Sequence, residues 1–320
     1  MNIVVTGSIA YDYLMSFPGK FTEHFLPEHM NRVSLSFLVD TMDKRRGGCA
    51  PNIAYTLALL GERPLLMATA GEDFGDYRQW LDAAGIDTTP RRSRSPASSA
   101  RRSSAAPTPR TTRSRRSTPA RWPTPASCRS APVKDCGLAI IAPNDPGAMV
   151  QYAEECRTLG IPFIFDPGQQ CARMEGDELR DGITGATIVI VNDYELELLA
   201  AEDRDERGRH PRRRQDADRD RAASTDRRSS RATGRWTCRR CAPARIVDPT
   251  GVGDAFRGGL MRGHLARPVA TKSAREMGSV AATYALEHMG GLSHAYTWDE
   301  FKARYQEHFG PTDAPGVESR

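Results

Sequence analysis

The sequence of 320 residues has no apolar run long enough to cross a bilayer. Its start, MNIVVTGSIAYDYLM, lacks the basic segment and apolar stretch of a secretory signal. The seven cysteines are scattered and odd in number, which argues against a disulfide framework. These absences predict a soluble cytoplasmic protein without a membrane partner. The length suits one large α/β domain or two smaller ones.

Acidic and apolar residues are also scarce in two segments, residues 90–134 and 203–245, called here the Arg-rich segments. The first holds 11 Arg, one Lys and no acid, a charge of +12, and the second holds 15 Arg against seven acids, a charge of +8. Since the whole chain carries +5, the remainder carries −15. The first segment has only Trp122, Cys128 and Val133 as sizeable apolar residues, too few to offset the entropy of ordering it in a core.

Three interpretations of the Arg-rich segments compete. They could be basic arms that bind the phosphates of nucleic acid, or linkers without a core. They could also be a GC-rich gene read in the wrong frame, because Arg, Pro, Ala, Thr and Ser are what the codons CGN, CCN, GCN, ACN and TCN encode. We favour the third interpretation, because a shifted reading of these residues gives text with the pattern of a globular protein.

The test uses shifted codons, each built from the last base of one codon and the first two bases of the next. Residues 110–126 can then be read as NNQIASFYTGAMAHA, and residues 221–241 as RGVDGSSIVxGDGxVDVPAV. Both texts have the apolar alternation and Gly turns of globular sequence. On this interpretation the pair Cys238 and Cys241 is accidental, and it lacks the two further ligands that a zinc site needs.

Outside the Arg-rich segments, strand and helix patterns alternate. This alternation predicts an α/β fold with a mostly parallel sheet and helices on both faces, and an active site at the carboxyl ends of the strands. The predicted strands lie at 3–7 and at the starts of 64–75, 137–145, 161–168 and 185–200; the predicted helices lie at 51–60, 76–86, 146–160, the end of 185–200, 253–266 and 277–290.

The most informative stretch is IVDPTGVGDAFRGG, residues 246–259. A Gly-x-Gly turn leads into a helix that begins near Asp254, so the backbone N–H groups of Gly251, Val252 and Gly253 would form an anion hole. A carboxylate beside such a hole suits the removal of a proton from a hydroxyl that attacks a phosphorus atom. On these residues alone, a simple helix N-cap is the favoured role of Asp254.

Four separated motifs carry a resemblance to a known family. DPTGVGDAFRGG is similar to the C-terminal signature of the ribokinase family, the PfkB sugar and nucleoside kinases, whose pattern is D-T-x-G-A-G-D. RGGCAPNIAYTLALLG (46–61) resembles the family's Gly-Gly signature, and GSIAYDYLM (7–15) and NDYE (192–195) follow the family order. The resemblance covers the chain outside the Arg-rich segments. Residues 17–40 and 144–170 are most similar to the bacterial adenosine kinase branch.

The resemblance implies an ATP-dependent kinase that uses Mg²⁺ and phosphorylates the 5′-hydroxyl of adenosine or a related ribose-containing compound. Asp254 would be the general base, and Asp12 would bind the ribose diol. Alone, Asp12 could merely cap a turn, Asn52 could start a helix, and Glu195 could lie on a solvated face. The implied substrate residues are Ser8, Asp12, Gly47, Gly48 and Asn52; Gly251, Val252 and Gly253 form the anion hole; Asn192, Glu195 and Thr250 bind Mg-ATP, and Asp248 lies near a site for a monovalent cation such as K⁺.

The departures from the family fall in the Arg-rich segments. The first replaces part of the small β lid over the sugar, which we therefore expect to be disrupted, and the second replaces the nucleotide-binding loop. The shifted text IASFYTGAM resembles the adenosine kinase stretch that brings an aromatic ring against the nucleoside, and RGVDGS resembles the T-x-G-x-x-G nucleotide loop. We therefore expect residues 1–320 to form one kinase domain with two frameshifted segments in it.

Alternative functions remain open from the sequence. Another ribokinase-type sugar or nucleoside kinase would keep Asp12 and Asn52 but differ in base-contacting residues, which the first Arg-rich segment obscures. An Arg-rich nucleic-acid-binding protein would lose affinity steeply with salt. An inactive product of a frameshifted gene would show neither kinase activity nor binding to nucleic acid. We favour the kinase, without a nucleic-acid partner, and the resemblance is compatible with a homodimer.

Overall fold

The computed structural model describes residues 2–16, 41–89, 101–105, 136–199, 221–224, 235–237, 239–266 and 272–311. Its strands form two sheets. The large one has seven strands in the order β10-β9-β8-β7-β6-β1-β4, and the small one has three in the order β3-β2-β5. The strands of the large sheet are β1 (Asn2–Thr6), β4 (Leu65–Met67), β6 (Cys136–Ile141), β7 (Phe163–Phe165), β8 (Ile188–Val191), β9 (Arg221–Ser224) and β10 (Arg235–Thr237).

The centre of the large sheet is parallel, as the sequence predicts. Strands β4, β1, β6, β7 and β8 pair in parallel, while β9 and β10 are antiparallel. Strands β7 and β8 read FIF and IVIV, and every residue in them is buried. Continuous apolar strands of this kind suit a sheet that is covered on both faces.

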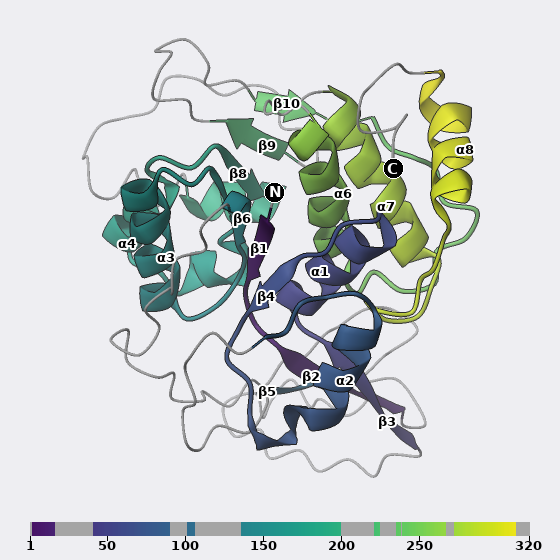
Figure 1. Ribbon diagram of the computed structural model, residues 1–320, viewed down its shortest axis with the longest axis horizontal. Coiled ribbons are helices and arrows are strands. Elements are labelled where there is room, and N and C mark those ends of the chain that lie inside the picture. The colour runs from purple at the N-terminus through teal and green to yellow at the C-terminus, as the bar shows by residue number, and fades with distance from the viewer. Residues whose placement is uncertain are drawn as a thin grey trace, which may run out of the picture.

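Helices cover both faces of the large sheet (Figure 1). Helices α3 and α4 lie on one face, and α1, α6 and α7 lie on the other, with α8 outside α7. Two apolar clusters fill the spaces between these layers, one around Ile53 and Leu260 and one around Phe163 and Met149. The helices are α1 (Cys49–Leu59), α2 (Gly75–Ala83), α3 (Pro146–Leu159), α4 (Gly176–Ile183), α6 (Val252–Ala266), α7 (Lys272–Leu286) and α8 (Trp298–Phe309), with 3₁₀ turns at Glu72–Phe74 and Gly168–Ala172.

Local signals fix several helix ends. Asp145 accepts a hydrogen bond from the Ala148 N–H at 3.2 Å, Pro146 follows it, and Gly160 ends α3 at a φ of 66°. Helix α8 begins with a capping box between Thr297 and Glu300. These caps place the boundaries of α3 within a residue of the predicted range, 146–160.

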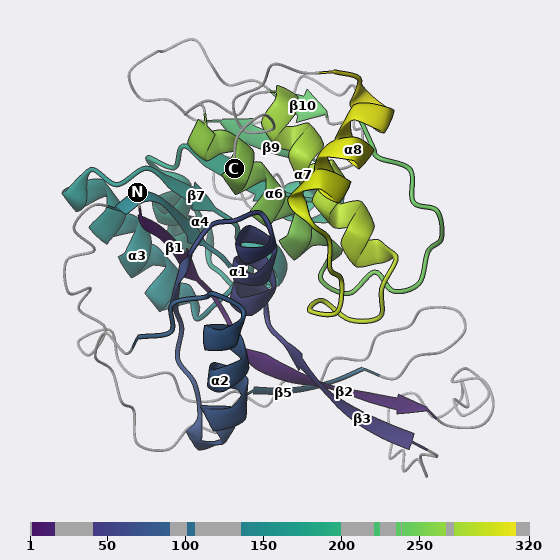
Figure 2. The ribbon, with the colours of Figure 1, turned by 45° about the vertical axis from the view of Figure 1, so that its right-hand side comes forward.

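The small sheet extends from the body below α1 and packs beside α2 (Figure 2). Its strands are β2 (Ala10–Ser16), β3 (Thr41–Gly47) and β5 (Arg101–Ala105). Strand β2 pairs antiparallel with β3, which places Asp12 opposite Arg45, and parallel with β5. Three strands of the expected lid are therefore present.

The strands β5, β9 and β10 lie within the Arg-rich segments, where we expected no core strand. Strand pairing uses backbone N–H and C=O groups, which any residue except proline supplies, so these short stretches can complete a sheet edge whatever their composition. Most of residues 90–134 and 203–245, with Cys128 and Cys238, lie outside the described residues. The described cysteines, 49, 136, 156, 171 and 241, are all free thiols. In the part of the chain that the structure describes, no helix is long and apolar enough to span a bilayer.

Candidate active site

Polar residues follow the carboxyl ends of four neighbouring parallel strands. Ser8 follows β1, Asn144 follows β6, Asp166 follows β7 and Asn192 follows β8. Asn144 and Asp166 are 2% and 0% exposed. Buried polar side chains at this edge mark the expected position of a site in an open parallel sheet.

The carboxylate of Asp254 lies in the first turn of α6, where it meets helix α1. The Asn52 side-chain amide donates a 2.8 Å hydrogen bond to Asp254 Oδ2. Asn52 is 4% exposed, and its Oδ1 has no hydrogen-bond partner in the described part of the structure. The two residues are 202 positions apart, and the structure brings these two predicted site residues into direct contact.

The turn before α6 is closely packed against a second glycine loop. Gly251 has a φ of 77°, and a Cβ atom on it would lie 2.6 Å from Gly291 Cα. A Cβ atom on Gly291 would in turn lie 2.6 Å from Asn52 Oδ1. The helical N–H pairing starts at Ala255, which donates to Gly251 C=O at 2.8 Å. The earlier N–H groups have no partner within the helix, although the Val252 N–H donates weakly to the Pro249 carbonyl at 3.5 Å. The helix start thus has the geometry of an anion hole, with the Gly251 and Gly253 N–H groups as its donors.

The predicted sugar-binding residues gather where β2 and β3 leave the body. The carboxylate of Asp12 lies against Gly47, where any Cβ atom would collide with it. Gly48 has a φ of 104° and precedes α1, and a Cβ atom on it would meet the Ser8 carbonyl at 2.5 Å. The Ser8 carbonyl also accepts from the Ala50 N–H. Glycine is therefore required at 48 for steric reasons, whatever the ligand, whereas a side chain at 47 would displace the Asp12 carboxylate.

A cavity of about 390 Å³ opens beside this cluster. None of the predicted substrate residues lines it. Tyr11 and Arg46, which precede Asp12 and Gly47 in the sequence, do line it, and so does Gly291, which packs against Asn52. Arg46 lies over the rings of Tyr77 and Trp80, 5.9 and 5.5 Å from their centroids. The cavity thus combines aromatic surface with a guanidinium and backbone glycines. Its residues are Tyr11, Lys44, Arg45, Arg46, Asp76, Trp80, Met289, Gly290, Gly291, Leu292 and Ser293.

Asn192 and Glu195 cap the short helix at 193–199. Asn192 N–H donates to Glu195 Oε2 at 2.9 Å, and Glu195 N–H donates to Asn192 Oδ1 at 2.8 Å. This reciprocal pair is a capping box and has a structural role of its own. Glu195 is 8% exposed, and burial raises the pKa of its carboxyl group, with a smaller rise from Asp166 and a lowering effect from Arg257.

Sequence reasoning missed an ion pair that joins these motifs. Arg257, in α6, donates from Nη2 to Asp166 Oδ1 at 2.6 Å, and its Nε pairs with Oδ2 of the same carboxylate. Burial raises the pKa of Asp166 despite this partner. The only signal in the sequence is an acid directly after the apolar run IPFIF, and nothing in that pattern identifies a partner 91 positions away.

Asp248 connects the turn before α6 to the 290 loop. Its Oδ1 accepts from the Thr250 backbone N–H at 2.9 Å and from the Thr250 hydroxyl at 2.7 Å. Its Oδ2 accepts from the Gly290 N–H at 2.9 Å. Both carboxylate oxygens are therefore engaged in holding the two loops together. The cation-binding role predicted for Asp248 stays a prediction.

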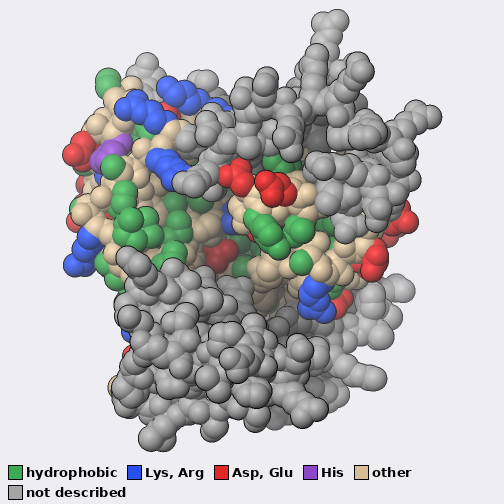
Figure 3. Space-filling view, turned by 180° about the vertical axis from the view of Figure 1, so that it is seen from behind, with side chains coloured by type: hydrophobic (Ala, Val, Ile, Leu, Met, Phe, Trp, Pro, Cys, Tyr) green, Lys and Arg blue, Asp and Glu red, His purple; other side chains and the backbone are tan. Residues whose placement is uncertain are grey.

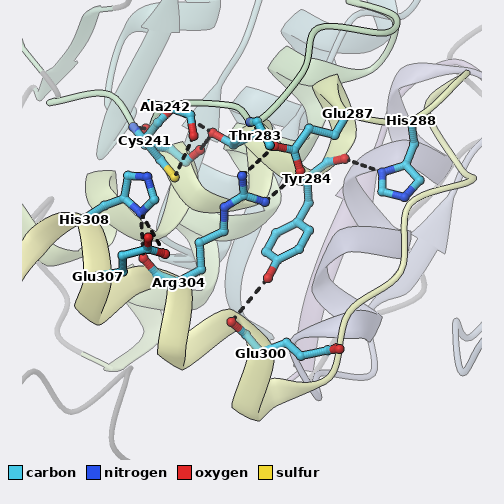
Figure 4. Close-up of polar contacts among 12 residues, drawn as sticks. Cys241, Ala242, Thr283, Tyr284, Glu287, His288, Glu300, Arg304, Glu307 and His308 are labelled. Carbon is cyan, nitrogen blue, oxygen red and sulfur yellow. Dashed lines mark hydrogen bonds and ion pairs between the residues drawn. The ribbon is translucent and has the colours of Figure 1, made fainter.

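The segment that contains Cys241 and Ala244, which precedes the turn before α6, is anchored by helices α7 and α8 (Figure 4). Arg304 makes two hydrogen bonds to Glu287, at 2.7 and 2.5 Å, and lies over the Tyr284 ring. Glu287 also accepts from the Ala244 N–H at 2.7 Å. The hydrogen bonds from Arg304 lower the pKa of Glu287. The Cys241 backbone N–H donates to the Ser279 hydroxyl, and the Cys241 carbonyl accepts from the Thr283 hydroxyl.

The described residues contain no group of three His, Cys, Asp or Glu side chains placed to hold a metal ion. This agrees with Mg²⁺, which is usually held by one or two carboxylates together with water and substrate phosphates. The buried carboxylate of Glu195, whose pKa is influenced by the nearby charges of Asp166 and Arg257, fits that requirement.

Charged side chains are interspersed on the face turned away in Figure 1 (Figure 3). Among the residues that the structure describes there, Lys and Arg side chains lie near Asp and Glu side chains, without a continuous basic stripe.

Comparison with known proteins identifies relatives along almost the whole chain. A family model described as pfkB family carbohydrate kinase matches residues 3–295. A nucleoside kinase of Methanothermobacter thermautotrophicus is 24% identical over 335 residues, which cover 97% of each chain. The structure of Burkholderia thailandensis nucleoside kinase with inosine is 31% identical with a TM-score of 0.72, covering 97% of this chain and 98% of that one. Methanocaldococcus jannaschii nucleoside kinase shares the fold at 18% identity, with a TM-score of 0.71 and coverage of 96% and 98%.

Proposed function

Because the chain belongs to the pfkB family of carbohydrate kinases, we propose that it transfers the γ-phosphoryl group of ATP to the 5′-hydroxyl of adenosine. The products are AMP and ADP. The observation that carries the proposal is the contact between Asn52 and Asp254 at the start of α6, beside the Gly251 turn. It joins a candidate base to an anion hole.

In the proposed reaction, Asp254 accepts the proton of the attacking hydroxyl. The Asn52 amide orients the carboxylate through its 2.8 Å hydrogen bond. The oxygen attacks the γ-phosphorus, the bond to ADP breaks, and the developing charge lies against the N–H groups of Gly251, Val252 and Gly253. The dipole of α6 adds to this stabilisation.

We assign the substrate to the junction of the two sheets. Asp12, fixed against Gly47, would accept hydrogen bonds from the ribose diol, with Ser8, Gly48 and Asn52 around it. Tyr11, Tyr77 and Trp80 line or border the neighbouring cavity and supply the aromatic surface that a nucleobase requires.

The phosphate end of ATP would lie toward Asn192, Glu195 and Thr250. Mg²⁺, when bound, neutralises charge on the phosphate oxygens. Glu195 would hold it from a buried position that the capping box fixes. We also propose a monovalent cation such as K⁺ near Asp248, a cytoplasmic location, and no nucleic-acid partner.

Substrate comparison tests the proposal. The purified chain is assayed for ADP formation from ATP with adenosine, inosine, ribose and fructose as acceptors. We expect the highest kcat/KM with adenosine. Inosine is included because a relative was solved with it. A preference for inosine would make the enzyme a nucleoside kinase of different base specificity, and equal or greater activity with ribose or fructose would contradict the adenosine assignment.

A further inference from the structure

Arg257 is held more firmly than its position on a helix requires. It lies one turn after Asp254 in α6, and its side chain is 13% exposed. One carboxylate holds it: Nη2 donates a 2.6 Å hydrogen bond to Asp166 Oδ1, and Nε lies in ion-pair contact with Asp166 Oδ2 without forming a hydrogen bond. The Asp166 side chain is 1% exposed. The hydrogen bond and the ion-pair contact together restrict the direction of the guanidinium.

The fixed guanidinium reaches the anion hole. Long side chains in a helix lean back toward its N-terminus and cover the preceding turn. Accordingly, a Cβ atom on Gly253 would lie 2.6 Å from Arg257 Nη1. The charges of Asp166 and Asp254 together raise the pKa of Arg257 against the opposing effect of burial. The cation is therefore near enough to both the candidate base and Asp166 for their charges to act on it.

Nη1 of Arg257 makes no hydrogen bond to any residue that the structure describes. Nη2 donates to Asp166 Oδ1, and Nε lies against Asp166 Oδ2 without a hydrogen bond. Its donors lie next to Gly253, whose own N–H belongs to the hole. An oriented, charged donor without a partner beside free backbone N–H groups is suited to an anionic oxygen.

Building on the proposed function, we propose that Arg257 is a further catalytic residue, which donates from Nη1 to an oxygen of the γ-phosphoryl group in the anion hole. Asp166 is the positioning residue that holds the guanidinium in place. The cation stabilises charge on the transferring group, and Asp166 and Asp254 prevent a net excess of positive charge around the base. The absence of a side chain at Gly253 leaves the space that Nη1 needs.

The test compares ATP-like and ADP-like ligands in the full chain. Arg257→Lys keeps the positive charge that pairs with Asp166 but has no second nitrogen that could donate to the phosphate. We expect the Kd of the ATP analogue AMP-PNP, measured by isothermal titration calorimetry, to rise about 10- to 100-fold, the worth of one hydrogen bond between charged groups. The Kd of ADP, which lacks the γ-phosphoryl group, should change less than about threefold.

Arg262→Lys is the matched control. Arg262 is in the same helix, is similarly buried, and pairs through Nε with Glu62 at 3.2 Å, away from the candidate site. We expect it to leave both Kd values unchanged. Equal weakening of AMP-PNP and ADP by Arg257→Lys, or no weakening, would overturn the role of Arg257 while the proposed function stands. Binding of neither nucleotide by the unmodified chain would overturn both.

A second variant separates binding from folding. Asp166→Asn combined with Arg257→Gln replaces the buried ion pair by two amides that can bond each other, so no lone charge stays buried. We expect a cooperative melt together with the same selective loss of AMP-PNP affinity. A folded double variant with the unmodified ratio of AMP-PNP to ADP affinity would show that the pair is structural only and would overturn the inference.

Discussion

In the proposed reaction, Asn52 is the residue that orients the base, Asp254. Its amide donates to Asp254 Oδ2 at 2.8 Å, and it is enclosed by Gly291. Asn52→Leu keeps the volume but removes the donor, so we expect kcat to fall about 10- to 100-fold, the worth of one hydrogen bond to a charged group. Steady-state kinetics with adenosine measure this.

Thr56→Val is the control, since Thr56 is fully buried one turn further along α1 and bonds the Asn52 carbonyl at 3.2 Å. It should lower stability by about 1 kcal/mol and leave kcat nearly unchanged. If both variants lost activity equally, Asn52 would be acting through stability rather than through the base.

At this scale, spacing and resemblance predict Asp254 and Asn52 as site residues because both belong to contiguous motifs, and the structure shows the contact between them. The Asp166–Arg257 pair could not be predicted in the same way. Each residue has an ordinary local explanation, a strand end and a helix surface, and only the fold places them 2.6 Å apart.

The proposed base, Asp254, lies on α6, whose backbone packs closely against that of α7. A Cβ atom on Gly259 would lie 2.5 Å from the Met277 carbonyl, and one on Gly263 would lie 2.5 Å from Ala274 Cα. Gly259→Ala therefore forces the helices apart, and we expect a loss of about 1–3 kcal/mol in the free energy of unfolding. Chemical denaturation measures it.

Gly75→Ala is the matched substitution, because Gly75 starts α2 with nothing within 4 Å of its Cβ position. It should be neutral or stabilising by up to about 1 kcal/mol. A Gly259→Ala variant as stable as Gly75→Ala would mean that the small residues of α6 are not required by packing.

Helices and buried strands could be predicted from apolar periodicity, and the structure confirms those at 51–60, 146–160 and 161–168 to within a few residues. Strand β3 reads TMDKRRG and is largely exposed, so it has no apolar pattern to detect. Helix α8 was not predicted, although Thr297 and Glu300 form a capping box that the sequence contains.

For the whole molecule, stability should depend on pH through a buried histidine. His294 is 0% exposed, and burial, with a smaller effect of His288, lowers its pKa from 6.5 to about 4. Between pH 4 and pH 6.5 the His294 ring is protonated in the unfolded chain but neutral in the folded chain. This contribution to the free energy of unfolding is therefore complete above pH 6.5 and falls by up to about 3 kcal/mol as the pH drops toward 4.

Denaturation at pH 4.5 and 7 measures that difference. In His294→Gln, which has no titrating ring, the decrease between the two pH values should be smaller by about 2 kcal/mol or more. An identical decrease in both proteins would show that His294 does not titrate in this range.

The reading frame of the Arg-rich segments is a property of the whole chain. We propose that residues 1–320 are one kinase domain in which 90–134 and 203–245 are translated from a shifted frame. Sequencing of genomic DNA across codons 85–137 and 200–247 should reveal compensating single-base changes that restore the shifted text. An unchanged sequence would mean that the segments are encoded as printed, and salt-dependent binding to nucleic acid would then need to be measured.

Phosphoryl transfer from ATP to adenosine by the unmodified chain and by Asp254→Asn, measured side by side, tests the central claim most directly. The amide keeps the shape of the side chain and its place at the start of α6 but cannot accept the proton. We predict turnover by the unmodified chain and a loss of about 100- to 10,000-fold in kcat for the variant, with adenosine still bound. Equal turnover by both proteins would contradict the assignment of Asp254 as the base.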